Sequence, residues 1–203
     1  MMKLLAAASI GLALAASAAA AQEAGQFTIG VGIGSVAPKN NNGTLAGAFR
    51  SSVGSNVQPT VTFEYFVARN IGIEVLAATP FKHNLRLNGA KAGEVTQLPP
   101  TVSVQYHFDN GGALVPFVGV GVNYTAVLKV KESGPLAGTN LDLDNSWGLA
   151  AHVGVDYKLN ETDAIRVDAR YIDIDLDAKL NGASIGTAKI DPWVYGVSWV
   201  HRF

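Results

Sequence analysis

Charged side chains alternate in sign along one segment of the chain. Arg166, Asp168 and Arg170 occupy every second position, and the residues between them are apolar. Because alternate side chains of a β-strand share a face, these three would form a charged face opposite an apolar one. Similar segments carry the candidate ion-pair partners Glu64, Glu74 and Asp156. Such a set either cross-braces the interior of a small barrel or forms a ring that selects ions.

Other residue types with catalytic potential are not spaced for catalysis. Ser103 and His107 share a face, but four residues of strand separate them by roughly 13 Å, too far for a hydrogen bond. Asp173, Asp175 and Asp177 could hold a divalent cation, but they lack the glycine and distal glutamate of a calcium loop, which favours a solvated acidic face. The sequence predicts a protein that is not an enzyme and needs no metal or cofactor.

The composition excludes several classes of protein. Of the 203 residues, 48% are hydrophobic and only 15% are charged, and there is no cysteine. A disordered chain and a disulfide scaffold are therefore excluded. Fifteen Lys and Arg residues against 16 Asp and Glu give a net charge of −1, so no basic field would attract nucleic acid.

The first residues read as a secretory signal peptide. Lys3 precedes an apolar run from Leu4 to Ala16, and small residues follow up to Ala21. This run is shorter than the roughly 20 residues of a spanning helix, which favours cleavage after Ala21 over an uncleaved anchor. Residues 1–21 are therefore assigned to the signal peptide and residues 22–203 to one mature domain.

Hydrophobic alternation with period two runs through the mature chain and predicts eight strands. They lie at about 27–34, 60–67, 71–78, 101–108, 118–125, 146–157, 165–171 and 193–203. Short connections, rich in turn-forming residues, alternate with longer polar or Gly-rich ones at about 37–57, 81–94, 131–140 and 178–186. An even strand number with this loop pattern is typical of antiparallel, up-and-down outer-membrane barrels, with both termini in the periplasm.

One wall of these strands is bulky and apolar, and the other is mostly small or charged. The bulky wall is too large to fill the interior of an eight-stranded barrel, so it is expected to face lipid rather than the lumen of a soluble barrel. Aromatic residues near strand ends fit interfacial girdles. These are Tyr65, Tyr106, Phe108, Tyr157, Tyr171, Trp193 and Trp199.

Several stretches resemble the OmpW family of small outer-membrane proteins across essentially the whole mature chain. They include residues 73–83, 105–108, 116–125, 146–151, 170–175 and 190–196. The resemblance implies an eight-stranded barrel with a narrow, largely apolar lumen, proposed to pass small hydrophobic molecules. Phe203 resembles the terminal aromatic that the outer-membrane assembly machinery recognises, although His201 stands where an aromatic residue is more usual.

Four apolar residues are expected to point into the lumen, namely Phe66, Leu76, Val115 and Phe117. They either fill space or line a path for an apolar solute. Proline cannot donate to a β-ladder, so Pro80, Pro99 and Pro100 predict missing rungs between two strands, in a register that sets Ile71 opposite Phe108. The gap would open the wall towards lipid, or the prolines lie above the bilayer and only end the strands.

The alternation changes character at Tyr171 and Ile172. Beyond this point Ile172, Ile174 and Leu176 take the even positions, and aspartates take the odd ones. Either a β-bulge shifts the phase, or the strand leaves the membrane and its outward face meets water.

Together these observations predict a Gram-negative outer-membrane barrel, surrounded by lipid, that passively transports small, hydrophobic molecules and can release them sideways. The alternative is a closed structural or adhesion barrel whose segments 37–57 and 81–94 bind a host surface, a phage or a bacteriocin. Flux of an apolar solute separates the two.

Overall fold

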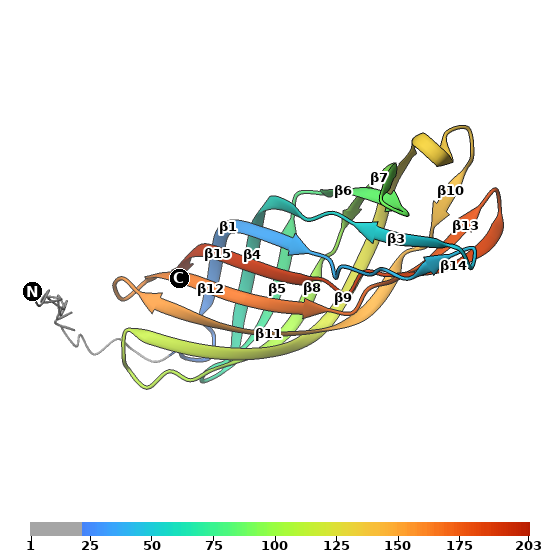
Figure 1. Cartoon of the computed structure of the whole chain (residues 1–203). Coiled ribbons are helices and arrows are strands. Elements are labelled where there is room, and N and C mark those ends of the chain that lie inside the picture. Colours follow the sequence, from blue (N-terminus) through green and yellow to red (C-terminus); the bar gives the residue numbers. More distant parts are fainter. Residues whose placement is uncertain (1–21) are drawn as a thin grey trace, which may run out of the picture.

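The computed structural model describes residues 22–203, so the signal peptide assigned to residues 1–21 lies outside the described part. Eight antiparallel strands form a closed barrel, in which β11 also pairs with β9 and so completes the ring (Figure 1). They are β1 (Phe27–Ala37), β4 (Asn56–Ala68), β5 (Ile71–Ala78), β8 (Thr101–His107), β9 (Leu114–Glu132), β11 (Ser146–Lys158), β12 (Asp163–Ile172) and β15 (Trp193–Arg202). The predicted eight-stranded barrel is confirmed.

The two ends of the barrel differ. At the short-turn end, brief turns join β4 to β5, β8 to β9 and β11 to β12, and Phe203 N donates to Phe27 O (3.0 Å) beside the first strand. At the opposite end, here called the hairpin end, further strands extend the wall. They are β2 (Thr44–Leu45), β3 (Phe49–Val53), β6 (Phe81–Leu87), β7 (Ala90–Leu98), β10 (Leu141–Leu143), β13 (Asp175–Leu180) and β14 (Ala183–Lys189), with a 3₁₀ helix at Gly134–Leu136.

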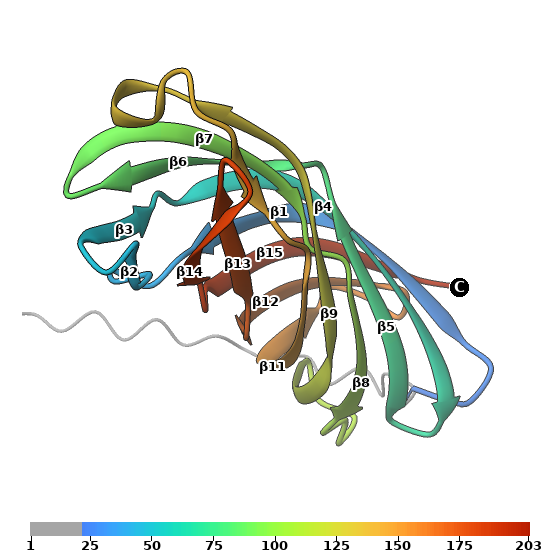
Figure 2. The same cartoon turned by 90° about the vertical axis from the view of Figure 1, so that its right-hand side faces the viewer.

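These hairpins correct the sequence analysis, which treated segments such as 81–94 as loops. The stretch from Phe81 to Leu87 alternates buried and exposed residues as regularly as the barrel strands do. Apart from the buried His83, its polar residues lie on the outer face, so the alternation was present although the composition suggested a loop. Seen from the hairpin end, β13 and β14 lie across from β6 and β7 (Figure 2).

Apolar side chains cover the outside of the barrel, as expected from the bulky apolar face of each predicted strand. Val120, Trp147 and Leu149 are 67%, 72% and 71% exposed, whereas their small neighbours along the strands point inward. Tyr171 and Trp193 pack together, with ring centroids 5.6 Å apart, towards the hairpin end. Tyr106 and Phe108 do so at 4.9 Å at the short-turn end. In residues 22–203 no helix has the length and apolar character needed to cross a membrane.

The hairpin end has the opposite arrangement, with its apolar side chains inside. Ile172, Ile174 and Leu176 are buried, whereas Asp173 and Asp175 are exposed. The pairing of β12 continues to Ile172 without a bulge, so even positions point inward throughout. The bulge interpretation is therefore wrong. The exposed aspartates on the outer face support the other interpretation, in which the strand leaves the membrane and its outer face meets water.

Candidate functional site

Arg166 crosses the lumen and binds carboxylates from three other strands. From β12 it donates to Asp156 on β11 through Nε (2.7 Å) and Nη2 (2.9 Å), to Glu74 on β5 through Nη1 (2.9 Å), and to Glu64 on β4 through Nη2 (3.2 Å). Its guanidinium carbon lies 4.5 Å from the centroid of the Phe117 ring. The planar fork of arginine suits this geometry, because it offers five donors to several carboxylates at once.

Two further side chains extend this network across the barrel. Arg170 Nη2 donates to the other oxygen of Glu74 (2.6 Å), and its Nη1 donates to Ser103 Oγ (3.1 Å). His107 Nε2 lies 2.7 Å from Glu64 Oε1. We call these residues the lumen network: Glu64, Glu74, His107, Asp156, Arg166 and Arg170. Every member is buried, so the network joins opposite walls in a region shielded from water.

The structure brings together five of the six charged residues predicted for the lumen. Asp168 is the exception, because it forms no ion pair with any residue in the described part of the chain. It lines a cavity of about 20 Å³ together with Leu76, Glu74 and both arginines. Ser103 and His107 bond to different partners within the network, so they do not form a catalytic pair.

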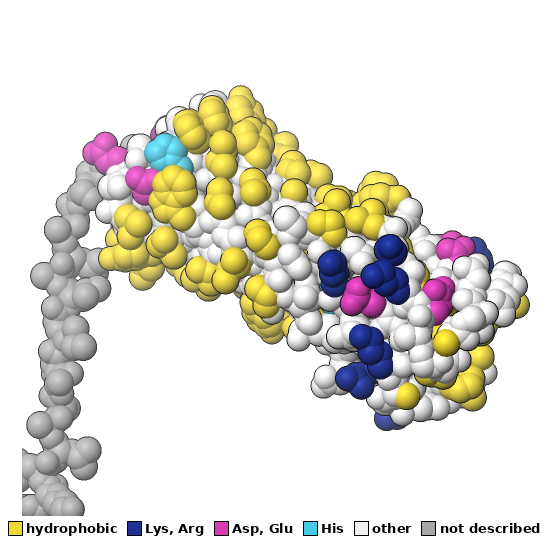
Figure 3. Space-filling model, turned by 90° about the horizontal axis from the view of Figure 1, so that it is seen from above, with side chains coloured by type: hydrophobic (Ala, Val, Ile, Leu, Met, Phe, Trp, Pro, Cys, Tyr) yellow, Lys and Arg dark blue, Asp and Glu magenta, His cyan; other side chains and the backbone are white. Residues whose placement is uncertain are grey.

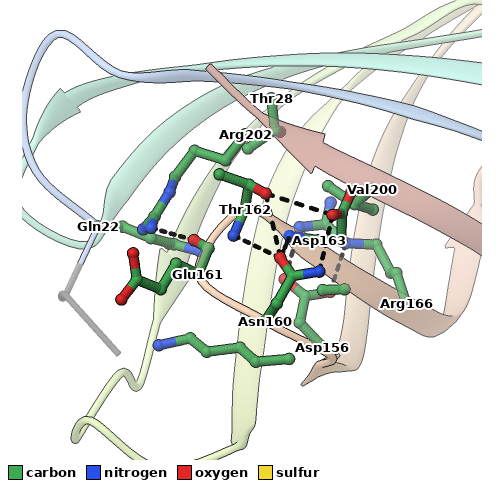
Figure 4. Close-up of a pocket in the computed structure, with 12 residues that line it drawn as sticks. Gln22, Thr28, Asp156, Asn160, Glu161, Thr162, Asp163, Arg166, Val200 and Arg202 are labelled. Atoms are coloured by element: carbon green, nitrogen blue, oxygen red, sulfur yellow. Dashed lines mark hydrogen bonds and ion pairs between the residues drawn. The ribbon is translucent and has the colours of Figure 1, made fainter. Parts of the chain in front are cut away.

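A second small cavity approaches the network from the short-turn end. It measures about 30 Å³ and is bounded by the turn 160–163 and by Gln22, Lys158 and Arg202 (Figure 4). Asp156 and Arg166 form part of its wall, and Arg166 also lines the cavity on the other side. The lumen network therefore separates two internal spaces.

The four apolar residues predicted for the lumen do not form one path. Phe66 and Phe117 pack on the His107 ring with centroids 5.3 and 5.2 Å apart, so they belong to the network region. Val115 is fully buried two residues from Phe117, towards the short-turn end. Leu76 instead lines the cavity on the hairpin side. The lumen network therefore lies between Leu76 and Val115, while Phe66 and Phe117 pack within it.

An apolar chamber fills the hairpin end, and the sequence analysis missed most of its residues. It is a cavity of about 20 Å³ lined by Leu45, Val53, His83, Leu85, Val95, Gln97, Leu141, Leu143, Leu176, Ala188 and Ile190. Burial lowers the pKa of His83, although the hydrogen bond between its Nδ1 and Gly54 O (2.6 Å) opposes the shift. The imidazole is therefore neutral at pH 7, in keeping with the apolar surroundings.

A gap interrupts the ladder between the barrel wall and the hairpins. The pairing of β5 with β8 ends at Leu76 and Thr101, and the pairing of β6 with β7 starts at Phe81 and Gln97. Residues 77–80 and 98–100 form no ladder pairs with one another. The predicted register was wrong by two residues, because Ile71 pairs with Tyr106 rather than Phe108. Counting back from Phe81, Pro80 lies level with Leu98.

Asn123 holds one edge of this gap. Its Nδ2 lies 3.0 Å from each of Pro99 O, Pro100 O and Thr101 Oγ1, and its side chain is buried. Tyr124 N also donates to Pro100 O (3.0 Å). The carbonyl groups at this edge therefore bond towards β9 and not across the gap.

Replacing Asn123 with Ala is expected to lower the free energy of unfolding by about 1–3 kcal/mol, because it removes a buried donor to the Pro99 and Pro100 carbonyls and the acceptor of the buried Thr125 hydroxyl. The measurement is the urea midpoint of the barrel refolded in lipid vesicles. Asn84→Ala is the control, since Asn84 is exposed and should change stability by no more than about 0.5 kcal/mol. Equal losses of stability in the two variants would contradict the role of Asn123 in holding this edge of the gap.

The family model described as "OmpW family" matches residues 23–203. The chain belongs to the OmpW family. Outer membrane protein W of Escherichia coli K12 is 40% identical over 213 residues, which cover 100% of both chains. The crystal structure of OprG from Pseudomonas aeruginosa superposes with a TM-score of 0.79 at 33% identity, covering 90% of this chain and 98% of that one. A more distant relative, 27% identical over 58% of this chain and 57% of its own length, is the dibenzothiophene metabolism operon protein PahQ of Pseudomonas aeruginosa.

His201 stands where the resemblance led us to expect an aromatic residue, and the structure shows how it fits. Its ring lies between Trp199 and Phe203, with centroid distances of 5.5 and 4.6 Å. Its Nδ1 lies 2.8 Å from Asp163 Oδ1. His201 therefore keeps the packing of an aromatic residue and adds a polar contact to the next strand.

The aspartates after Ile172 differ from the predicted group. Asp173, Asp175 and Asp191 have carboxylate oxygens within 4.8 Å of one another, whereas Asp177 accepts a hydrogen bond from Thr187. Burial and the neighbouring carboxylates raise the pKa of Asp173. Lys39 and Lys189 already pair with Asp191 and Asp175. This arrangement fits a solvated acidic face.

Proposed function

We propose that this outer-membrane barrel passively admits small, apolar molecules through the hairpin end and releases them sideways into the membrane. One observation carries the proposal. The lumen network closes the barrel towards the short-turn end, whereas the ladder gap at residues 77–80 and 98–100 lies on the hairpin side of the network.

The two halves of the lumen favour different solutes. An apolar solute that crossed the network would have to separate buried ion pairs, and breaking one such pair costs several kcal/mol. On the hairpin side it meets leucine, valine and isoleucine side chains. At about 20 Å³ the chamber holds roughly one water molecule, so passage requires the hairpins to move apart.

Relatives support the choice of solute. The resemblance to the OmpW family implies passage of small hydrophobic molecules. PahQ is named for an operon of dibenzothiophene metabolism, which concerns an apolar aromatic compound. We extend that solute class, and no specific compound, to this chain. Non-enzymatic function stays a prediction.

The proposal also assigns an orientation. The short-turn end and both termini would face the periplasm, and the hairpins would face outward. Phe203 is 58% exposed, stacks on Phe27 with ring centroids 4.9 Å apart, and stays the predicted signal for the assembly machinery.

Leu76→Arg is expected to reduce uptake of an apolar dye to the level of cells that lack the protein, because it places a charge at the inner edge of the gap through which the solute would leave. The measurement is the rate at which N-phenyl-1-naphthylamine fluorescence rises in intact cells. Leu76→Met, which retains an apolar side chain, should leave the rate unchanged. If wild-type cells show no more uptake than cells without the protein, the proposal fails and the adhesion alternative gains.

A further inference from the structure

A basic patch lies on the outer wall of the hairpin end, next to the apolar belt. It consists of six exposed residues on β3, β6, β7 and β9: Arg50, Lys82, Arg86, Lys91, Lys129 and Lys131. Figure 3 shows basic side chains gathered beside the apolar side chains of the barrel. Within the described part of β6, β7 and β9, Glu94 is the acidic residue on this face, and it is only half-exposed.

A β-bulge directs two of these lysines outward. Thr96 pairs with Lys129 and Gln97 pairs with Val127, so Leu128 is an extra residue on β9. The bulge shifts the phase of the strand and turns Lys129 and Lys131 to the outer face. Lys82 also pairs with Thr96, so Lys82 and Lys129 lie two strands apart, or roughly 10 Å.

The six cations have no ion-pair partner among residues 22–203. The lysines on the opposite side of the hairpin end differ in this respect. Lys39, Lys179 and Lys189 pair with Asp191, Asp144 and Asp175 at 2.5, 2.7 and 3.2 Å. The hairpin end is therefore polarised, with neutralised lysines on one side and unneutralised cations on the other.

We propose that the basic patch binds the phosphate groups of phosphorylated glycolipids in the outer leaflet of the outer membrane. The patch continues the lipid-facing wall of the same strands, since Lys129 lies five residues beyond Tyr124, or about 17 Å of strand. Exposed lysines on a flat surface hold a free anion weakly. A lipid in the same membrane is held beside the wall at high local concentration, which favours the lipid-anchored phosphate.

The test compares lipid A binding by the wild-type barrel and a triple variant, Lys82→Gln with Lys129→Gln and Lys131→Gln. Full-length mature protein is refolded in detergent micelles doped with diphosphoryl lipid A, and bound lipid is counted by native mass spectrometry. Binding should weaken about 100-fold in the triple variant. Monophosphoryl lipid A should bind the wild type more weakly than the diphosphoryl form.

The matched control removes the same charge from the other side, by Lys39→Gln with Lys179→Gln and Lys189→Gln, and should bind lipid A as the wild type does. A Lys82→Arg, Lys129→Arg and Lys131→Arg variant should retain binding as well. Equal loss in both glutamine variants would overturn the proposal, because net charge alone would then explain binding. Displacement of lipid A by millimolar inorganic phosphate would also overturn it, since the site would then recognise free anions.

Discussion

Replacing Arg166 with Met is expected to lower the free energy of unfolding by at least about 3–5 kcal/mol, the cost of removing one partner from a buried ion pair. Arg166 contacts three carboxylates, and all three would stay buried without their shared cation. The measurement is the urea midpoint of the barrel refolded in lipid vesicles, read from the gel shift between folded and unfolded forms.

A variant in which carboxylates are neutralised together with Arg166 separates the effect of charge on stability from the effect of packing. Arg166→Met combined with Glu64→Gln and Asp156→Asn neutralises the two carboxylates that lose their cation, while Glu74 stays paired with Arg170, and should recover most of the lost stability. Arg166→Lys keeps one charge but loses the planar fork, so an intermediate value is expected. A loss of under about 1 kcal/mol in the single variant would contradict the bracing role of the network, because such a loss is typical of an exposed pair.

Joining the two edges of the ladder gap is expected to abolish uptake of the apolar dye. Ala78→Cys and Pro99→Cys place one thiol on each edge, and the chain has no other cysteine. Oxidation or a short bismaleimide linker joins them, and reduction of the disulfide should restore uptake. The solute is expected to leave through this part of the wall because no backbone hydrogen bonds between the two edges need to break there.

The control crosslink lies on another wall of the barrel. Val167 and Val197 are paired on β12 and β15, and both face outward, so Val167→Cys with Val197→Cys gives a similar staple away from the gap. This variant should take up dye at the wild-type rate. Normal uptake with the gap fully crosslinked would exclude the lateral route.

Strand alternation made the barrel and the ion-pair partners predictable. Arg166 and Arg170 share a face because they are two residues apart, and inward carboxylates on other strands were the available partners. The height of each residue along the barrel axis was not predictable, so the sequence did not separate Leu76 from Val115. Their positions on either side of the network depend on strand register.

The strand register and the structure of the hairpin end were the main features that the sequence did not predict correctly. β6 and β7 intervene between β5 and β8, so no short turn fixes how Ile71 pairs with β8. Nothing in the local sequence around Leu128 predicts the β-bulge that this residue forms. At Ile172 the sequence pattern is compatible with a bulge or with a regular strand, and only the tertiary structure shows that the even positions continue to point inward.

The most direct test of the lateral route is photoaffinity labelling of the wild-type barrel in outer-membrane vesicles with a small apolar diazirine, followed by mapping of labelled residues by mass spectrometry. The account predicts labels on lumen-facing residues of the hairpin side, such as Leu85 and Leu76, and none on Phe117 within the network or on Val115 beyond it. Comparable labelling of Val115 and Phe117 would show that solutes pass along the barrel axis and would contradict the account.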